Sequence, residues 1–154
     1  RISWGYCGDS RLYHFRGKRM MTRTIDHSYV EHLVAIGKIT PEEALTHPNR
    51  NILLTSLGGS DEPRFDFAEV DDLRAGHAFV LCSHGLWAYF EEDEMATLVA
   101  DNSARKACEI LIDKARQRAE GTGDNISLAV IKLLDAAPSK PKSSSSFPSL
   151  EKFR

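Results

Sequence analysis

The chain has 154 residues and a formal net charge of -2, and 42% of its residues are hydrophobic and 27% charged. This length favours one domain, and the composition is typical of a globular protein. The balanced charge excludes the basic surface of a nucleic-acid-binding protein, and apolar runs such as 78–82 are too short to span a bilayer. We therefore expect neither nucleic acid nor a membrane among its partners.

The cysteines and the first residues suggest a compartment. Cys7, Cys82 and Cys108 form no CxxC pair, and their odd number argues against a disulfide framework or a zinc ribbon. Cys82 and Cys108 have apolar neighbours and are expected to be small core residues. Residues 1–6 carry no apolar signal segment, so a cytoplasmic location is expected. The chain opens without Met in a strand-like run, as a chain cut from a longer protein would.

The first third of the chain predicts strands followed by helices. Apolar residues alternate over 2–7, a turn is expected at 8–10, and further strands are expected at 12–15 and 20–22. Together these predict an antiparallel meander. Helical spacing follows from Tyr29 to Ile36. Thr40-Pro41-Glu42-Glu43 is a capping box that should begin a second short helix.

The rest of the chain predicts a mixed α+β arrangement. Strands are expected at 65–70, at 78–82 and at 126–133, with helices at 91–99 and 103–120 between the last two. Residues 78–82 are continuously apolar, as in a strand buried on both faces. From residue 136 the chain is rich in Ser, Pro and Lys. We expect a domain over 1–135 and a disordered tail over 136–154.

Three polar segments follow predicted strands or helices and could carry chemistry. They are Gly8-Asp9-Ser10-Arg11, Ser83-His84-Gly85-Leu86-Trp87 and Gly123-Asp124-Asn125. Carboxylates on such loops suit Mg²⁺ or Mn²⁺. Taken alone, Asp9 and Asp124 are better explained as turn residues, because aspartate often bonds the local backbone. His27 and His47 are likewise expected in turns or caps.

The order and spacing of five segments resemble the PP2C (PPM) family of metal-dependent protein serine/threonine phosphatases. Segment 8–13 resembles the family's GDSR(A/L)Y motif. Segment 24–48 resembles the flap of bacterial members, and segment 54–58 resembles the residues that follow this flap. Segment 80–87 resembles the LLCSDGLW motif, and segment 121–127 resembles the GGxDNIT motif. The resemblance covers nearly all of residues 2–133.

The resemblance implies a fold and a site. The fold class would be α+β, a partial α-β-β-α sandwich of PP2C type with antiparallel sheets. Asp9, His84 and Asp124 would face Mg²⁺ or Mn²⁺, with Asp124 at the core metal pair and Asp9 at a third, weakly held ion. A metal-activated water would hydrolyse phosphoserine or phosphothreonine in a phosphoprotein substrate. Arg11 does not match the family's phosphate-binding arginine and is expected in an ion pair or a turn.

Two departures from the family pattern predict impaired activity. His84 stands where the family has a ligand aspartate, which removes a negative charge and favours softer metals. The chain also contains no match to the family's earlier motifs. We therefore expect little or no phosphatase activity from this chain alone, and self-association through exposed sheet edges.

Two other interpretations stay open. The chain could be a non-catalytic pseudophosphatase that binds phosphoproteins or another partner, and His84 favours this alternative. It could also be an unrelated α+β domain whose aspartates are structural, which the five matched segments disfavour.

Overall fold

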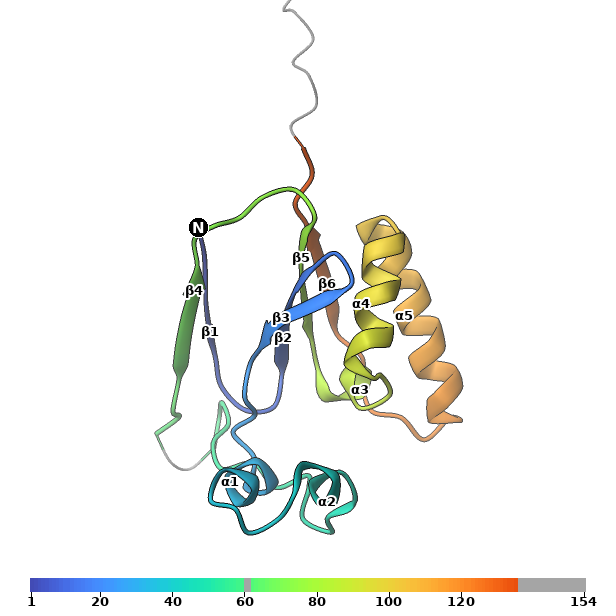
Figure 1. The fold of residues 1–154 in the computed structure, drawn as a ribbon. Coiled ribbons are helices and arrows are strands. Elements are labelled where there is room, and N and C mark those ends of the chain that lie inside the picture. Colours follow the sequence, from blue (N-terminus) through green and yellow to red (C-terminus); the bar gives the residue numbers. More distant parts are fainter. Residues whose placement is uncertain (60–61, 136–154) are drawn as a thin grey trace, which may run out of the picture.

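The computed structural model of the chain describes residues 1–59 and 62–135, so the predicted tail lies outside the described residues. Its strands form two antiparallel sheets (Figure 1). The smaller sheet pairs β1 (Ile2–Tyr6) with β4 (Asp66–Val70). The larger sheet has the order β3-β2-β5-β6 and contains β2 (Arg11–Arg16), β3 (Arg19–Arg23), β5 (His77–Cys82) and β6 (Leu128–Lys132).

Two helices cover one face of the larger sheet. α4 (Glu92–Asp101) and α5 (Ala104–Ala119) lie side by side against it (Figure 1). Ser103 caps α5 by accepting from the Lys106 backbone N–H, and α5 ends at Glu120, which has a left-handed backbone. The core between sheet and helices includes Tyr13, Phe15, Val80, Met95, Val99 and Leu111, each at most 1% exposed. This burial is the main stabilising term for the layer pair.

The smaller sheet packs on the opposite face. Trp4 of β1 contacts Phe79 of β5, with ring centroids 6.5 Å apart. Phe79 also stacks on His14, at 4.5 Å between centroids, and the His14 Nε2 lies 3.0 Å from Nδ1 of His77. Alternate residues of β2 and β5 therefore face the helices or the second sheet, which explains why both strands are buried along most of their length.

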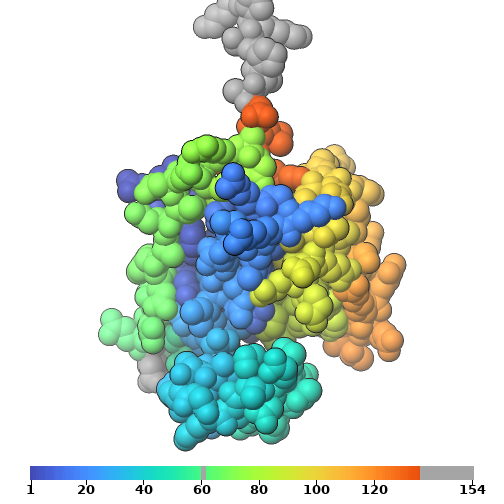
Figure 2. Space-filling model, viewed as in Figure 1, coloured from blue at the N-terminus to red at the C-terminus, as the bar shows by residue number. Residues whose placement is uncertain are grey.

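Two short helices form a lobe at one end of the sheets. α1 (Tyr29–Ala35) and α2 (Pro41–Thr46) lie there in Figures 1 and 2. Ser28 caps α1, and Thr40 with Glu43 completes the predicted capping box of α2. α1 buries Leu33, whereas no residue of α2 is buried. Capping therefore supports two helices that bury few side chains of their own.

The predicted meander is wrong at its first step. β1 pairs with β4 rather than with β2, because the chain crosses between sheets at the Gly8–Asp9 turn. The following pair, β2 with β3, is antiparallel as expected. The structure also contains α3 (His84–Trp87), which the sequence did not predict, and it begins the last strand at Leu128 rather than at Ile126.

The cysteines are all free thiols. Cys82 belongs to the core, as predicted, and burial raises the pKa of its thiol to about 12. Cys108 is half-buried on α5. Within the part of the chain that the structure describes, no helix is long and apolar enough to cross a membrane.

Candidate functional site

Two of the three singled-out segments meet where β5 runs into α3. A Cβ atom at Gly85 would overlap the backbone carbonyl oxygens of Asp124 and Asn125, so only glycine allows this close approach. The Ser83 hydroxyl donates to the Asn125 carbonyl at 3.1 Å and accepts from the Ser127 N–H at 2.9 Å. Segment 83–85 and segment 124–127 are therefore held together by the Ser83 hydroxyl and by the close backbone approach at Gly85.

The third segment reaches the same place through a side chain. Asp9 lies in the turn between β1 and β2, and its Oδ2 is 3.0 Å from Nδ1 of His84 at the start of α3. The two side chains are 25% and 31% exposed. The hydrogen bond from His84 lowers the pKa of the Asp9 carboxyl, partly opposed by burial. Asp9 is therefore an ionised carboxylate at neutral pH, partly open to solvent and paired with an imidazole.

A tryptophan and an arginine hold the Asp9 turn. The Trp87 indole N–H donates to the Asp9 carbonyl at 2.8 Å, and the Arg11 guanidinium lies 3.5 Å from the centroid of the Trp87 ring. Arg11 also donates to both carboxylate oxygens of Asp26, at 2.9 and 2.8 Å, and to the Tyr13 hydroxyl at 3.0 Å. The expected ion pair of Arg11 is confirmed, and through Trp87 it supports the turn that carries Asp9.

Asp124 does not join the pair with its carboxylate. Its Oδ1 accepts from the Asn125 N–H at 2.7 Å, which is a local turn contact on an exposed residue. Across residues 1–59 and 62–135, no group of three or more His, Cys, Asp or Glu side chains is arranged to hold a metal ion. The structure thus brings Asp9 and His84 side chains together, and brings Asp124 near them through its backbone.

The side chains that meet here supply one carboxylate, Asp9, and one imidazole, His84, because the Asp124 carboxylate bonds the Asn125 N–H instead. Mg²⁺ is commonly bound through one or two carboxylates with several retained waters, so this pair fits part of a site for a weakly held ion. It does not fit a closed cage, which would need more protein ligands. The imidazole of His84 contributes no negative charge when neutral and prefers softer metals.

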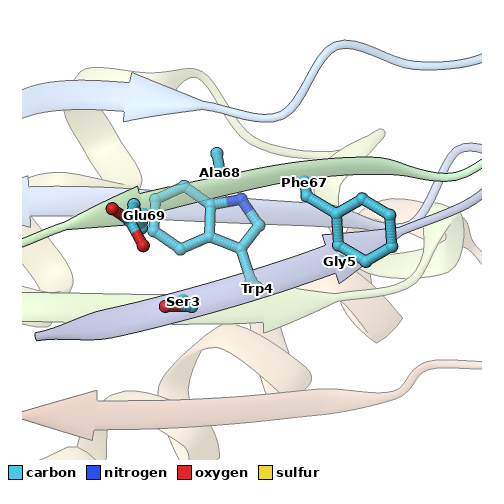
Figure 3. A pocket seen from close by; sticks show the side chains of 6 residues that line it. All are labelled: Ser3, Trp4, Gly5, Phe67, Ala68 and Glu69. Carbon is cyan, nitrogen blue, oxygen red and sulfur yellow. The ribbon is translucent and has the colours of Figure 1, made fainter.

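Two of the hollows on the surface of the described residues are of interest. One, of about 500 Å³, lies on the β1–β4 sheet, where the Phe67 ring covers Gly5 (Figure 3). It contains none of the three predicted site residues. The other, of about 460 Å³, is lined by Gly85, Asp124 and Asn125 together with the end of α5, including Arg116. The second hollow therefore adjoins the candidate site.

The sequence did not predict the roles of two contributors to this region. Trp87 was part of a matched segment, but its bond to the Asp9 carbonyl could not be foreseen. His27, expected in a turn or cap, accepts from the Gly8 N–H through Nδ1 at 3.2 Å and contacts Asp66 at 3.2 Å. Its position next to a capping serine was the only signal, and it pointed to a local role.

Known proteins of similar sequence are bacterial phosphatases. Protein phosphatase PhpP of Streptococcus pneumoniae is 35% identical over 131 residues, which cover 84% of this chain and 52% of PhpP. Serine/threonine protein phosphatase PstP of Mycobacterium tuberculosis is 32% identical over 136 residues, which cover 88% of this chain and 26% of PstP. The chain is a relative of the PP2C (PPM) protein phosphatases, and it matches their C-terminal part. No protein-family model matches the chain.

Solved PP2C structures confirm the predicted fold class. The serine/threonine phosphatase of Streptococcus agalactiae superposes with a TM-score of 0.73 at 30% identity, over 85% of this chain and 53% of that one. The catalytic domain of PstP in complex with two manganese ions gives a TM-score of 0.69 at 29% identity, over 86% of this chain and 54% of that one. The chain thus spans about half the length of PhpP and of these solved domains.

Proposed function

We propose that this chain forms the C-terminal part of a metal-dependent protein serine/threonine phosphatase whose hydrolytic activity is weakened by His84. Homology to PP2C-type phosphatases supports the reaction class and a phosphoprotein substrate. Because the chain spans about half of PhpP, activity and substrate are proposed for the protein that contains the complete domain. Three free thiols favour the cytoplasm as its location.

The proposed metal ligands are Asp9, Asp124 and, with lower charge, His84. A bound Mg²⁺ or Mn²⁺ would activate a water molecule and neutralise charge on the phosphoryl oxygens. The chain's own residues hold the site in shape. Trp87 and Arg11 fix the Asp9 turn, while Ser83 and Gly85 bring segment 124–127 against α3.

The contact between His84 and Asp9 is the observation that carries the proposed impairment. An aspartate at position 84 would place two carboxylates side by side, and their repulsion would be relieved by a bound cation. With His84, the imidazole N–H bonds Asp9 Oδ2 at 3.0 Å and stabilises that carboxylate without a metal. A metal ion must therefore break an existing hydrogen bond, and it meets one negatively charged ligand fewer than it would with aspartate at position 84.

Activity measurements on matched proteins test this proposal. The chain would be assayed alone and joined to the unmatched N-terminal part of PhpP, with p-nitrophenyl phosphate and a phosphothreonine peptide in the presence of Mn²⁺. We expect little turnover from the chain alone and weak turnover from the chimera. His84→Asp in the chimera should raise metal-dependent turnover by about tenfold or more, since a metal ligand is restored. Asp9→Asn serves as the control that lacks a proposed ligand.

Robust Mn²⁺-dependent turnover from the His84 chimera, undiminished relative to His84→Asp, would contradict the impairment and identify a working variant. Binding of the phosphopeptide without hydrolysis by either protein would instead support the alternative, a pseudophosphatase that recognises phosphoproteins. His84 is the feature that favours this alternative, because it stabilises Asp9 without a cation.

We also propose self-association through exposed strands. The ring of Phe67 on β4 is 78% exposed, and Leu81 on β5 and Ile131 on β6 are 41% and 50% exposed. Apolar side chains on strands at or beside sheet edges favour pairing with other chains. Light scattering at rising concentration should show species larger than a monomer, and a monomer throughout would count against the idea.

A further inference from the structure

His27 joins more segments near the candidate site than a turn residue needs to. It lies between β3 and α1 and is 8% exposed. Its backbone N–H donates to the Gly8 carbonyl at 2.9 Å, and its carbonyl accepts from the Leu54 N–H at 2.8 Å. Its ring accepts from the Gly8 N–H, contacts Asp66 Oδ2, and stacks on Tyr6 with centroids 5.1 Å apart. One residue thus links β1, the Gly8 turn, the segment after α2, and β4.

These partners define the protonation of the His27 ring. A backbone N–H can only donate, so Nδ1 of His27 must accept and carries no proton in this arrangement. The Asp66 carboxylate can only accept, so Nε2 carries the proton and donates to it at 3.2 Å. The ring is therefore neutral with its proton on Nε2, and Asp66 selects that form.

The consequence falls on Asp9. Gly8 has φ of +86°, a left-handed conformation, and His27 holds both its N–H and its C=O. Both peptide planes around Gly8 are therefore oriented by His27, and the next residue is Asp9. Trp87 holds Asp9 from the other side, through the Asp9 carbonyl.

We infer that His27 is a positioning residue: through Gly8 it fixes the backbone of the turn that presents the Asp9 carboxylate, and Asp66 keeps its ring in the required tautomer. This inference rests on the proposed function in so far as Asp9 binds a metal ion. The simpler alternative is that His27 only anchors the lobe formed by α1 and α2.

Two amide substitutions, each mimicking one ring nitrogen, separate these roles. His27→Asn places a carbonyl oxygen near the position of Nδ1 and keeps an acceptor for the Gly8 N–H. His27→Gln places an N–H donor near the position of Nε2, keeps the contact with Asp66, and loses that acceptor. A role limited to anchoring the lobe predicts similar behaviour of both variants, whereas positioning of Asp9 predicts that they differ.

The test is an NMR experiment on the complete chain at neutral pH, with thermal unfolding as the check on folding. Long-range ¹H–¹⁵N spectra should show the proton of the wild-type His27 ring on Nε2. The Gly8 and Asp9 amide signals should stay near their wild-type positions in His27→Asn and move in His27→Gln. Mn²⁺ should broaden the Asp9 signal of the wild-type chain. The affinity for Mn²⁺ measured from this broadening should fall about tenfold in His27→Gln but much less in His27→Asn.

The outcomes are distinguishable. A proton on Nδ1, or equal Gly8 and Asp9 signals in the wild type and in a folded His27→Gln, would overturn the inference. If Mn²⁺ leaves the Asp9 signal of the wild-type chain unchanged, the proposed metal role is contradicted. The signals of the His27 ring and of the Gly8 and Asp9 amides would still decide whether His27 positions the turn. If His27→Gln fails to fold, Asp66→Ala, which removes the acceptor of the Nε2 proton, provides the second test. It should populate the other ring tautomer and shift the Gly8 amide, and an unchanged ring spectrum would overturn the inference.

Discussion

Replacing Arg11 by methionine should destabilise the chain strongly. The Arg11 side chain is 15% exposed and that of Asp26 is 6% exposed, and the two form a two-pronged hydrogen bond at 2.9 and 2.8 Å. Arg11→Met keeps an apolar stem on the Trp87 ring but leaves the Asp26 carboxylate buried without its cation. Breaking a buried pair in this way costs about 3–5 kcal/mol. Because Asp26 keeps some access to water, we expect about 3 kcal/mol.

Urea unfolding measures this loss directly, and the chain supplies a matched control. Arg105 pairs with Glu109 at 3.2 Å on the surface of α5, and its side chain is 90% exposed. Arg105→Met should change the free energy of unfolding by no more than about 0.5 kcal/mol. The loss in free energy of unfolding for Arg11→Lys should lie between those for Arg11→Met and Arg105→Met. An ammonium keeps the charge but loses the bidentate hydrogen bond and the stacking on Trp87.

A loss below about 1 kcal/mol for Arg11→Met, close to the Arg105 control, would refute the reasoning. It would show that the Arg11–Asp26 pair does not hold the turn. The support that Arg11 gives to Asp9 through Trp87 would then have to come from other contacts.

Three further predictions concern the body of the fold. Lys132→Met should lower the free energy of unfolding by about 2 kcal/mol, because the ammonium donates hydrogen bonds to three carbonyls at the end of α4, the shortest of them 2.6 Å long. A loss of no more than about 0.5 kcal/mol in thermal unfolding would contradict this role. Burial and the neighbouring His77 lower the pKa of His14 below 6.5, so the unfolded chain binds that proton more tightly and the free energy of unfolding should fall as pH drops below 6.5. His14→Gln should make the free energy of unfolding depend less on pH in this range, and an unchanged pH dependence would count against this role of His14. Gly85→Ala should lower the free energy of unfolding by about 2 kcal/mol or more, because the new Cβ would overlap the carbonyls of segment 124–125. Wild-type stability of the variant would show that this contact is loose.

Local patterns in the sequence predicted most elements but not the partners of every strand. The capping box at Thr40 and the helix predicted at 103–120 depend on neighbours a few residues away, and the structure has both. The pairing of β1 depends on a strand sixty or more residues later, and the turn at Gly8 does not show which sheet the chain enters next. α3 has only four residues, too few for a periodic pattern.

The candidate site was predictable only as a set of segments. Asp9 and His84 lie 75 positions apart in the chain, and only the resemblance to a family suggested that they face a common site. Their hydrogen bond follows from tertiary packing that no local rule describes. The contacts of His27 with Gly8 and Asp66 were missed for the same reason, since all its side-chain partners lie at least 19 positions away.

His84 is the residue proposed to weaken metal-dependent hydrolysis. The most direct test is the Mn²⁺ concentration for half-maximal phosphopeptide hydrolysis in the chimera with PhpP, measured with and without His84→Asp. We predict that the substitution lowers this concentration about tenfold or more and raises the maximal rate. Identical Mn²⁺ curves for the two proteins would show that His84 does not weaken metal-dependent hydrolysis.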